Sequence, residues 1–261
     1  MSSETIIKEN LNYWSKRASG YSHINREELE NYDHKTSWSQ VLDDHIKTAF
    51  PAKNKDDISV LEIGCGPGFL SILLTELGYR VTAVDLTPNM LAEAKKNAGR
   101  IADQICFIQM NAEELTFRDE TFDVIVSRNL TWDLPNPTSA YKEWKRVLKN
   151  KGLLLNFDAN WYRYLFDDNA KKAYEKDRQE TALGGYKDKN IGENFDKMEE
   201  IARKIPLSSL LRPKWDIDTL TDLSFDVTAD PSIWKKVWTK EEQINFSSTP
   251  MFLIRAVKKR K

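Results

Sequence analysis

Short apolar runs alternate with helix-like patterns through the middle of this chain. Runs rich in β-branched and aromatic residues, bounded by glycine or polar turn residues, are typical of buried strands. The pattern predicts strands at Ile58–Ile63, Arg80–Val84, Ile105–Gln109, Phe122–Ser127 and, after a turn at residues 149–152, Leu153–Phe157. Apolar residues at helical spacing separate these runs. Strands that alternate with helices predict a parallel sheet covered by helices on both faces.

Two of the intervening helices carry start and stop signals. Leucines recur at helical spacing between Leu70 and Leu77, and Gly78 supplies the C-terminal stop. After the second strand, Thr87 is a predicted N-cap and Pro88 occupies the first helical position. These signals fix the helices between the first three strands.

The pattern changes outside this α/β region, which spans residues 56–159. Residues 1–55 are predicted to form an N-terminal helical lid, and residues 160–211 a helical cap insertion broken at Gly184-Gly185 and Gly192. Residues 212–261 complete the sheet with a helix and two strands, near Asp216–Leu223, Phe225–Ala229 and Pro250–Val257. The expected fold is therefore α/β, with a mostly parallel seven-stranded sheet and a helical cap. Both flanking helical segments are expected to lie outside the sheet core.

A glycine loop joins the first strand to the helix that follows it. Three glycines alternate along the segment Glu62-Ile-Gly-Cys-Gly-Pro-Gly68. Since glycine has no Cβ, this backbone can pass close to a ligand. Asp85 ends the second strand, where an acidic side chain can accept hydrogen bonds from two ribose hydroxyls. Together the loop and the acid predict a nucleoside site.

The acid before the first glycine separates two kinds of nucleoside site. A dinucleotide loop has the spacing GxGxxG and leaves the helix N-terminus free to hold a pyrophosphate. The Glu62 carboxylate would repel a pyrophosphate, whereas it would suit a ligand that carries an ammonium group. The segment resembles the first motif of the class I S-adenosylmethionine-dependent methyltransferases. The resemblance covers residues from about 56 to 159 and implies a Rossmann-like fold.

Later motifs extend the resemblance. Asn111-Ala112 matches the pair that recognises the adenine edge, although the family more often has Asp at the first position. Met90 matches a residue that covers the adenine ring, with core packing as the alternative. The resemblance implies that the cofactor S-adenosylmethionine contacts Tyr13, Tyr21, Glu62, Gly64, Cys65, Gly66, Gly68, Asp85, Leu86, Met90, Asn111, Ala112, Ser127 and Arg128.

Several of these assignments have alternatives. Arg128 could make a structural salt bridge, and Tyr21 could belong to an amphipathic helix that packs with Trp14 on the sheet edge. Trp132 and Asp133 follow the fourth strand and are expected to face the acceptor, together with three aromatic residues of the flanking segments, Trp38, Trp161 and Tyr162. Such a pocket favours a flat or cationic small molecule. The alternative is that these rings only build the core between cap and sheet.

No catalytic residue is assigned from the sequence. The histidines His23, His34 and His45 all lie in the N-terminal segment. On one continuous helix, their even spacing would place them on one side but about 16 Å apart, too far to share a metal. No metal site is therefore predicted. His34 is the first candidate for an acceptor-side base, with Trp132 and Asp133 as further weak candidates and a plain structural role as the alternative.

Composition narrows the partners. The chain has 261 residues and a net charge of −1, so no global field recruits nucleic acid or an anionic membrane. It has two cysteines, a polar N-terminus and no long apolar run, which predicts a protein of the reducing cytoplasm. The oligomeric state is open.

The expected activity is transfer of a methyl group from S-adenosylmethionine to a small organic acceptor. The sequence resembles most the group that includes ubiquinone and menaquinone C-methyltransferases. Neither the acceptor nor the methylated atom, O, N, S or C, follows from the sequence. A non-catalytic cofactor-binding or regulatory protein on the same fold stays open. An NAD(P)-dependent oxidoreductase is disfavoured by the spacing of the loop and by Glu62.

Overall fold

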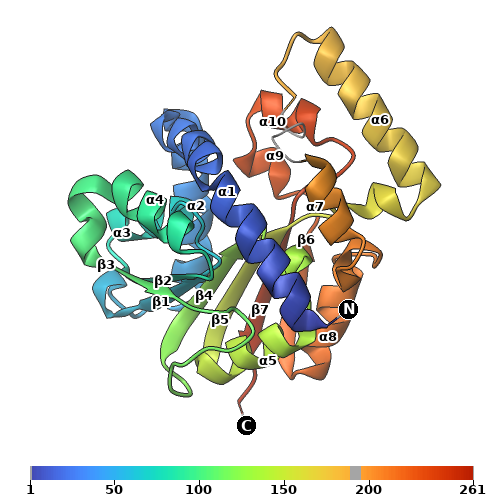
Figure 1. The fold of residues 1–261 in the computed structure, drawn as a ribbon. Coiled ribbons are helices and arrows are strands. Elements are labelled where there is room, and N and C mark those ends of the chain that lie inside the picture. The colour runs from blue at the N-terminus through green and yellow to red at the C-terminus, as the bar shows by residue number, and fades with distance from the viewer. Residues whose placement is uncertain (1, 189–194, 261) are drawn as a thin grey trace.

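A seven-stranded sheet forms the centre of the molecule in the computed structural model, which describes residues 2–188 and 195–260 (Figure 1). The strand order is β3-β2-β1-β4-β5-β7-β6, and β7 runs antiparallel to both of its neighbours. The mostly parallel seven-stranded sheet is therefore confirmed. The strands are β1 (Ser59–Ile63), β2 (Arg80–Asp85), β3 (Ile105–Gln109), β4 (Phe122–Arg128), β5 (Leu148–Asp158), β6 (Phe225–Asp230) and β7 (Phe252–Lys258).

Helices cover both faces of this sheet. The described α-helices are α1 (Ser3–Glu30), α2 (Tyr32–Ala49), α3 (Phe69–Glu76), α4 (Pro88–Ala98), α5 (Pro137–Val147), α6 (Asp168–Leu183), α7 (Phe195–Ala202), α8 (Lys214–Asp222), α9 (Trp234–Val237) and α10 (Lys240–Asn245). None of the helices in the described part of the chain is long and apolar enough to cross a membrane.

The predicted strands agree with the structure except at the start of β5. The sequence predicts a turn over residues 149–152, but β5 already begins at Leu148. Leu148 pairs with Phe122, and the register then shifts so that Val124 pairs with Leu153. Lys151 has a φ of 61°, so the turn geometry is real but lies inside an irregular strand.

One face of the sheet packs against α2, α3 and α4. Trp38, Leu42 and Ile46 of α2 are fully buried in the same cluster as Leu73 of α3 and Val60 of β1. The expectation that residues 1–55 lie wholly outside the sheet core is therefore wrong for α2. Its apolar side chains sit four residues apart, and this helical spacing puts them on one face against the sheet.

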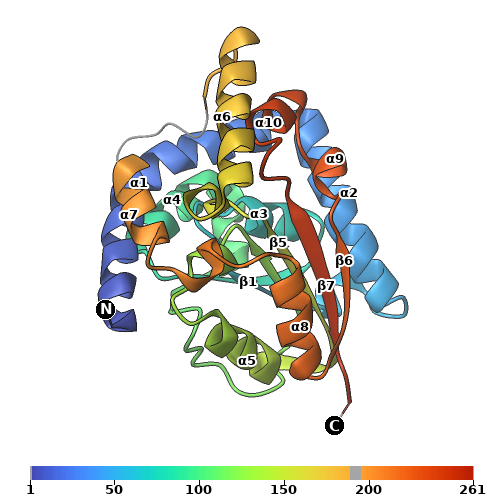
Figure 2. The same cartoon turned by 90° about the vertical axis from the view of Figure 1, so that its right-hand side faces the viewer.

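The opposite face packs against α5 and α8. Tyr141 and Trp144 of α5 and Leu220 of α8 are fully buried with Leu61 of β1 and Leu154 of β5. Figure 2 shows α5 and α8 together below the sheet, with α3 and α4 above it. Successive side chains of a strand point to opposite faces of the sheet and therefore pack into two separate apolar layers.

Asn31 separates α1 from α2. Its backbone N–H donates to the carbonyl oxygen of Glu27, and its side chain accepts from the amide of His34 at 3.0 Å. Asparagine is a favoured N-cap because its side-chain oxygen satisfies a free helical amide. The three histidines therefore do not share one continuous helix, and the expected geometry of their spacing is wrong.

The cap insertion, residues 160–211, contains α6 and α7. Ile6 of α1 packs with Met198 and Ile201 of α7, so the N-terminal helix and the cap insertion share a small core. Gly184 follows α6, as predicted, whereas Gly192 lies outside the described residues. The helices α9 and α10 between β6 and β7 were not predicted, and they bring Trp238 and Phe246 into the large core cluster.

A buried arginine that follows the cap insertion connects α8 to the end of β5. Arg212 donates to Asp158 at the end of β5 at 2.6 Å and to both carboxylate oxygens of Asp216 in α8 at 2.7 and 2.9 Å. All three side chains are fully buried. Asp158 also accepts the backbone N–H of Trp132 at 3.0 Å, so this network fixes the loop that follows β4.

Candidate active site

The glycine loop leaves β1 and turns over the carboxyl end of β2. The amides of Gly64 and Cys65 donate to the carbonyl oxygen of Val84 at 2.8 and 3.0 Å. Gly64 has a φ of +70°, and a Cβ added there would lie 2.7 Å from the side chain of Leu130. A side chain at this position would be strained and would collide with the loop after β4, so the close approach requires glycine.

Asp85 fixes the second half of the loop. Its two carboxylate oxygens accept from the amides of Gly66 and Thr87, each at 2.8 Å. Burial raises the pKa of Asp85, and the two amide donors oppose that rise. Because a carboxylate offers about four acceptor sites, Asp85 can still accept hydrogen bonds from vicinal hydroxyls of a ligand.

A first cavity opens beyond the carboxyl ends of β1, β2 and β4, where ligands of open α/β sheets bind. Asn111 contributes a carbonyl oxygen that accepts from the amide of Glu113 at 3.1 Å and retains a second lone pair. Most of the predicted cofactor residues line this cavity, namely Tyr21, Gly64, Gly66, Asp85, Leu86, Met90, Asn111, Ala112 and Arg128.

Other predicted cofactor residues lie behind this wall. Gly68 has a φ of +90°, and a Cβ there would lie 3.1 Å from the Cβ of Ala94, so this glycine serves the packing of α3 on α4. The Ser127 hydroxyl donates to the carbonyl oxygen of Ile63 at 3.0 Å and is fully buried. Cys65 is buried beneath the loop and does not line the cavity.

Glu62 is also buried below the loop. Its carboxylate accepts from the hydroxyl of Ser71 in α3, so it points toward the helix and does not line the first cavity. Burial raises the pKa of Glu62 to about 8, and the hydrogen bonds from Ser71 only partly offset this effect. The structure thus brings Glu62 close to the site without placing it on the cavity wall.

A second cavity borders the first and is walled mostly by aromatic rings. Its aromatic lining comprises Tyr13, Trp14, Tyr21, Trp132, Trp161, Tyr162, Tyr164, Trp238 and Phe246. Trp14, Tyr21, Arg128 and Asn129 line both cavities and form their shared boundary. Tyr13 lines only the second cavity, although the resemblance implies a cofactor contact for it.

One face of α1 supplies a wall of the second cavity. Tyr13, Arg17, Tyr21, Ile24 and Glu28 recur at intervals of three or four residues, which places them on the same side of the helix. Figure 1 shows α1 crossing the molecule between α4 and α7. The stripe therefore faces inward, toward the carboxyl edge of the sheet.

Trp132 lies on the wall of the second cavity, as expected. Its indole N–H donates to the carbonyl oxygen of Asn129 at 3.0 Å, and its ring centroid lies 4.9 Å from that of Tyr162. Trp161 reaches the same cavity. The expectation for Trp38 is wrong, because this ring is fully buried in the core and does not line the second cavity.

Asp133 lines the first cavity and not the second. Two side chains of α1 hold it: Trp14 donates to one carboxylate oxygen at 2.6 Å and Asn10 to the other at 2.9 Å. Burial raises the pKa of Asp133 to about 7. Asp133 therefore anchors α1 at the first cavity instead of facing the second.

Arg128 forms a buried ion pair and also lines both cavities. Its guanidinium donates to the carboxylate of Glu28 at 2.6 and 3.2 Å and lies over the rings of Trp38 and Phe69 at 4.8 and 4.7 Å. The structural salt bridge considered from the sequence is thus present, on a residue that lines both cavities. The next residue, Asn129, has a φ of +56°, a backbone strain that non-glycine residues often carry at functional positions.

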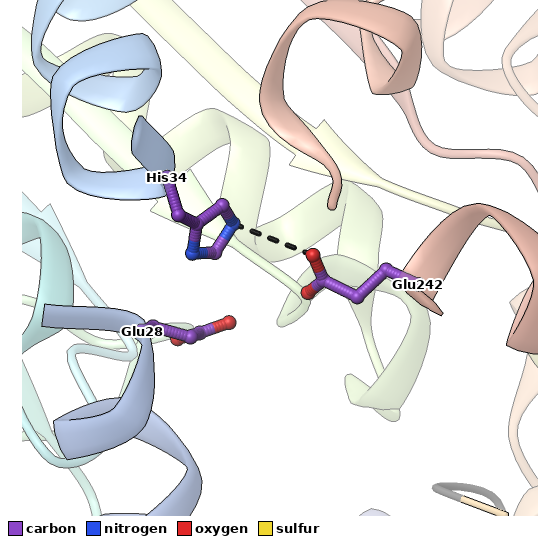
Figure 3. A group of neighbouring side chains, drawn as sticks. All are labelled: Glu28, His34 and Glu242. Atoms are coloured by element: carbon purple, nitrogen blue, oxygen red, sulfur yellow. Dashed lines mark ion pairs between the residues drawn. The ribbon is translucent and has the colours of Figure 1, made fainter. Parts of the chain in front are cut away.

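His34 lies beside a third, acidic cavity and does not line the second. Its Nε2 accepts from the indole N–H of Trp38 at 3.1 Å and lies 3.5 Å from a carboxylate oxygen of Glu242. Figure 3 shows Glu28, His34 and Glu242 converging from α1, α2 and α10. One potential ligand atom of each lies within 4.8 Å of the others, so the three side chains form a cluster that could bind a cation. The sequence does not predict this cluster.

Sequence reasoning missed several lining residues, notably Asn10, Glu242 and Phe246. A capping box does mark α10, since Thr239 and Glu242 exchange side-chain and backbone hydrogen bonds. That signal could have identified the helix. Nothing in it indicates that α10 lies opposite α1.

Comparisons with known proteins agree with this geometry. Residues 61–156 match the model of a methyltransferase domain. A putative methyltransferase of Bacillus subtilis, YqeM, is 33% identical over 133 residues, which is 49% of this chain and 49% of that protein. A ubiquinone biosynthesis O-methyltransferase of Glaesserella parasuis is 35% identical over 100 residues, 36% of this chain and 42% of that protein. The matches thus span about half or less of these relatives.

Solved structures extend the likeness to nearly the whole fold. The plantazolicin methyltransferase BpumL, in complex with a pentazolic desmethylPZN analog and S-adenosylhomocysteine (SAH), superposes with a TM-score of 0.62 and 14% identity over 99% of this chain and 98% of that one. A phosphoethanolamine N-methyltransferase of Haemonchus contortus gives a TM-score of 0.55 and 17% identity over 85% of this chain and 53% of that one. The chain thus has the Rossmann-like methyltransferase fold, and the resemblance stated from the sequence is confirmed.

The buried Glu62 predicts a pH-dependent stability. Its pKa in the folded protein, about 8, exceeds the ordinary value of 4.5, so the folded state holds a proton that the unfolded state releases between these pH values. The protein should therefore lose stability relative to a Glu62→Gln variant as the pH rises from 4.5 to 8. The change in free energy of unfolding should be no more than about 5 kcal/mol.

Urea denaturation of both proteins at several pH values between 5 and 9 checks this expectation. The variant Glu175→Gln, at an exposed position of α6, is the control for loss of one carboxyl group. A constant difference between Glu62→Gln and the original protein across the pH range would contradict a neutral, buried Glu62.

Proposed function

We propose that this protein is an S-adenosylmethionine-dependent methyltransferase whose acceptor is a small organic molecule. The observation that carries the proposal is the contact between two cavities at the carboxyl edge of the sheet. The first offers the features of a nucleoside site. The second is lined mostly by aromatic rings and shares only one boundary with the first. A reaction between a nucleoside cofactor and a second molecule requires such an arrangement.

The residues of the first cavity fit the nucleoside part of the cofactor. Asp85 has acceptor sites left for two ribose hydroxyls, and the absence of a Cβ at Gly64 and Gly66 leaves the loop backbone open to the ligand. Met90 and Asn111 lie on the same wall. There Met90 would cover an adenine ring and Asn111 would accept a hydrogen bond from its amino group. Buried polar atoms without a hydrogen-bond partner indicate where the rest of the ligand would bind.

The amino-acid end of the cofactor requires an acceptor for its ammonium group and a cation for its carboxylate. Asn10 lines the first cavity, and its Oδ1 atom is buried without a hydrogen-bond partner. Arg17 lines the second cavity, one helical turn from Tyr21 of the shared boundary; it makes no ion pair in the described part of the chain, and its buried Nε has no partner. Burial raises the pKa of Tyr21, and the charge of Arg17 is close enough to oppose part of this rise. The Tyr21 ring would lie 3.9 Å from a Cβ at Gly66. We assign the carboxylate to Arg17 and the ammonium group to Asn10.

The protein contributes alignment and environment to the reaction, since the bound sulfonium supplies the electrophilic methyl group. The shared boundary of Trp14, Tyr21, Arg128 and Asn129 orients the two ligands toward each other. Correct alignment of two reactants can account for about 7–11 kcal/mol of an activation barrier. The aromatic walls exclude water from the acceptor, which strengthens each remaining polar contact.

Three features disfavour the other functions considered. A nicotinamide dinucleotide is typically held by a loop of spacing GxGxxG, whereas this loop has its glycines at positions 64, 66 and 68. A macromolecular acceptor such as nucleic acid would favour a basic surface, whereas the chain is nearly neutral. A purely regulatory protein would not need a second cavity next to the first. The two free thiols, Cys65 and Cys106, support a cytoplasmic location.

Calorimetry tests the cofactor directly. The protein should bind S-adenosylmethionine and SAH, and it should not bind NADH. The variant Asp85→Ala should weaken SAH binding by about 1–3 kcal/mol, because charge-assisted hydrogen bonds to the ribose are lost. Asp222→Ala, at an exposed position of α8, is the control and should bind as the original protein does. Tighter binding of NADH than of SAH would refute the methyltransferase proposal.

The role of Arg17 has a sharper test, because methylthioadenosine lacks the amino-acid end of SAH. Arg17→Met should weaken SAH binding about tenfold, in line with loss of a charged hydrogen bond. The same variant should bind methylthioadenosine unchanged. Arg26→Met, on the exposed side of α1, should leave both affinities unchanged. Equal weakening of both ligands by Arg17→Met would mean that Arg17 supports the cavity without contacting the carboxylate.

The lid expected from the sequence stays a proposal, now restricted to α1, α6 and α7, because α2 belongs to the core. Segments that close over a site come from the less stable parts of a structure. Hydrogen exchange with and without SAH should show slower exchange in α1 when SAH is bound, with α5 on the opposite face as the internal reference. Identical exchange of α1 in both states would favour a rigid accessory helix.

A further inference from the structure

We propose that the acceptor is an amine, and that its nitrogen binds between Glu242 and the aromatic wall of the second cavity. The inference rests on the proposed methyltransferase activity and adds the chemical class of the acceptor. The charges that line the second and third cavities carry it. The charged residues differ in whether they form an ion pair within the described structure.

The second cavity has four charged lining residues, Arg17, Glu28, Arg128 and Glu242. Arg128 pairs with Glu28 through two hydrogen bonds, and Arg17 is assigned to the cofactor carboxylate. Glu242 is the remaining charge. No lysine or arginine within the described chain forms an ion pair with it.

Glu242 is held rigidly, and the basic groups near it are His34, at 3.5 Å, and Arg128, which pairs with Glu28. One of its carboxylate oxygens accepts from the backbone N–H and the hydroxyl of Thr239 at 2.8 and 2.9 Å. The carboxyl group is buried, with 6% of the residue exposed. A buried carboxylate is costly unless donors or a cation compensate it. The structure therefore presents a carboxyl group of fixed position to whatever occupies the cavity.

The third cavity strengthens the preference for a cation. It shares Ile24, Glu28 and Glu242 with the second cavity, and no lysine or arginine is among its described lining residues. Five carboxylates line it, from Glu27, Glu28, Glu30, Glu241 and Glu242. A cavity lined by one sign of charge concentrates molecules of the opposite sign. A protonated amine would thus be drawn to the point where the two cavities meet.

The aromatic wall suits the same ligand. Trp161, Trp238 and Phe246 lie next to one another, with ring centroids 5.4 Å apart for Trp161–Phe246 and 5.6 Å for Trp238–Phe246. Their faces favour a cation placed over them, and they also favour stacking with a flat organic group. A cationic amine with an apolar body would gain from both contacts.

A resident metal ion explains the convergence of Glu28, His34 and Glu242 less well. Both oxygens of Glu28 already accept N–H groups of Arg128, and the Nε2 atom of His34 accepts from Trp38. A metal would have to displace these donors. An ammonium group needs no such change, because its N–H groups can share carboxylate oxygens that already accept other hydrogen bonds.

The reaction balances without a further reactant. The bound ammonium first loses a proton to the Glu242 carboxylate, the acceptor that the proposed position of the amine provides. The nitrogen lone pair then forms the N–C bond as the bond between the methyl carbon and sulfur breaks. The products are SAH and an N-methylated ammonium, which keeps the positive charge that the sulfonium gives up.

Binding of three matched probes to the SAH complex tests the proposal. The probes are 2-naphthylmethylamine, which is cationic at pH 7, the neutral 2-naphthylmethanol and the anionic 2-naphthoate. The cationic probe should bind at least tenfold more tightly than the other two. Glu242→Gln should remove this preference and leave binding of the neutral probe unchanged. Glutamine keeps the capping box, so the variant preserves α10.

The control Glu175→Gln, at an exposed position of α6, should retain the preference for the cationic probe. Failure of the amine to bind up to about 10 mM, equal affinity for the neutral or anionic probe, or an equal loss of all three in Glu242→Gln would overturn the proposal. Binding of Mn²⁺ or Zn²⁺ that depends on Glu242 and excludes the amine would overturn it in favour of a metal site. SAH binding is measured first, so failure of the methyltransferase proposal is recognised separately.

Discussion

The buried ion pair between Arg128 and Glu28 is the contact on which the geometry of the site depends. It joins the end of β4 to the distant helix α1, and the rings of Trp38 and Phe69 lie against the guanidinium. Loss of one partner from such a pair typically costs about 3–5 kcal/mol, because the other charge stays buried. Both partners line the second cavity, so the contact that holds α1 in place also shapes the site.

The central sheet and the glycine loop could be predicted because their signals are local. Alternating strands and helices identify the sheet, and β3 has the bounds that its apolar run predicts. The spacing of the glycines and of Asp85 reflects a single strand–loop–helix–strand unit, whose geometry involves few distant residues. The finer role of each glycine needed the structure, since Gly68 packs against α4 while Gly64 and Gly66 line the first cavity.

The acceptor side could not be predicted in the same way, because it is assembled from segments far apart in the chain. The identity of Glu242 suggests only a helix start, yet α10 brings it to Glu28 of α1 and His34 of α2. The burial of Trp38 likewise depends on how α2 packs against the sheet. Hydrophobic periodicity identifies the buried face of a helix, but it does not identify the element that covers it.

The wall that the two cavities share has a thermodynamic consequence. Trp14, Tyr21, Arg128 and Asn129 contact both spaces, so a ligand that orders them in one cavity alters the free energy of binding in the other. Such coupling is reciprocal: the factor by which the cofactor changes the affinity for the acceptor equals the factor by which the acceptor changes the affinity for the cofactor. The same four side chains therefore link the affinities of the two cavities for their ligands.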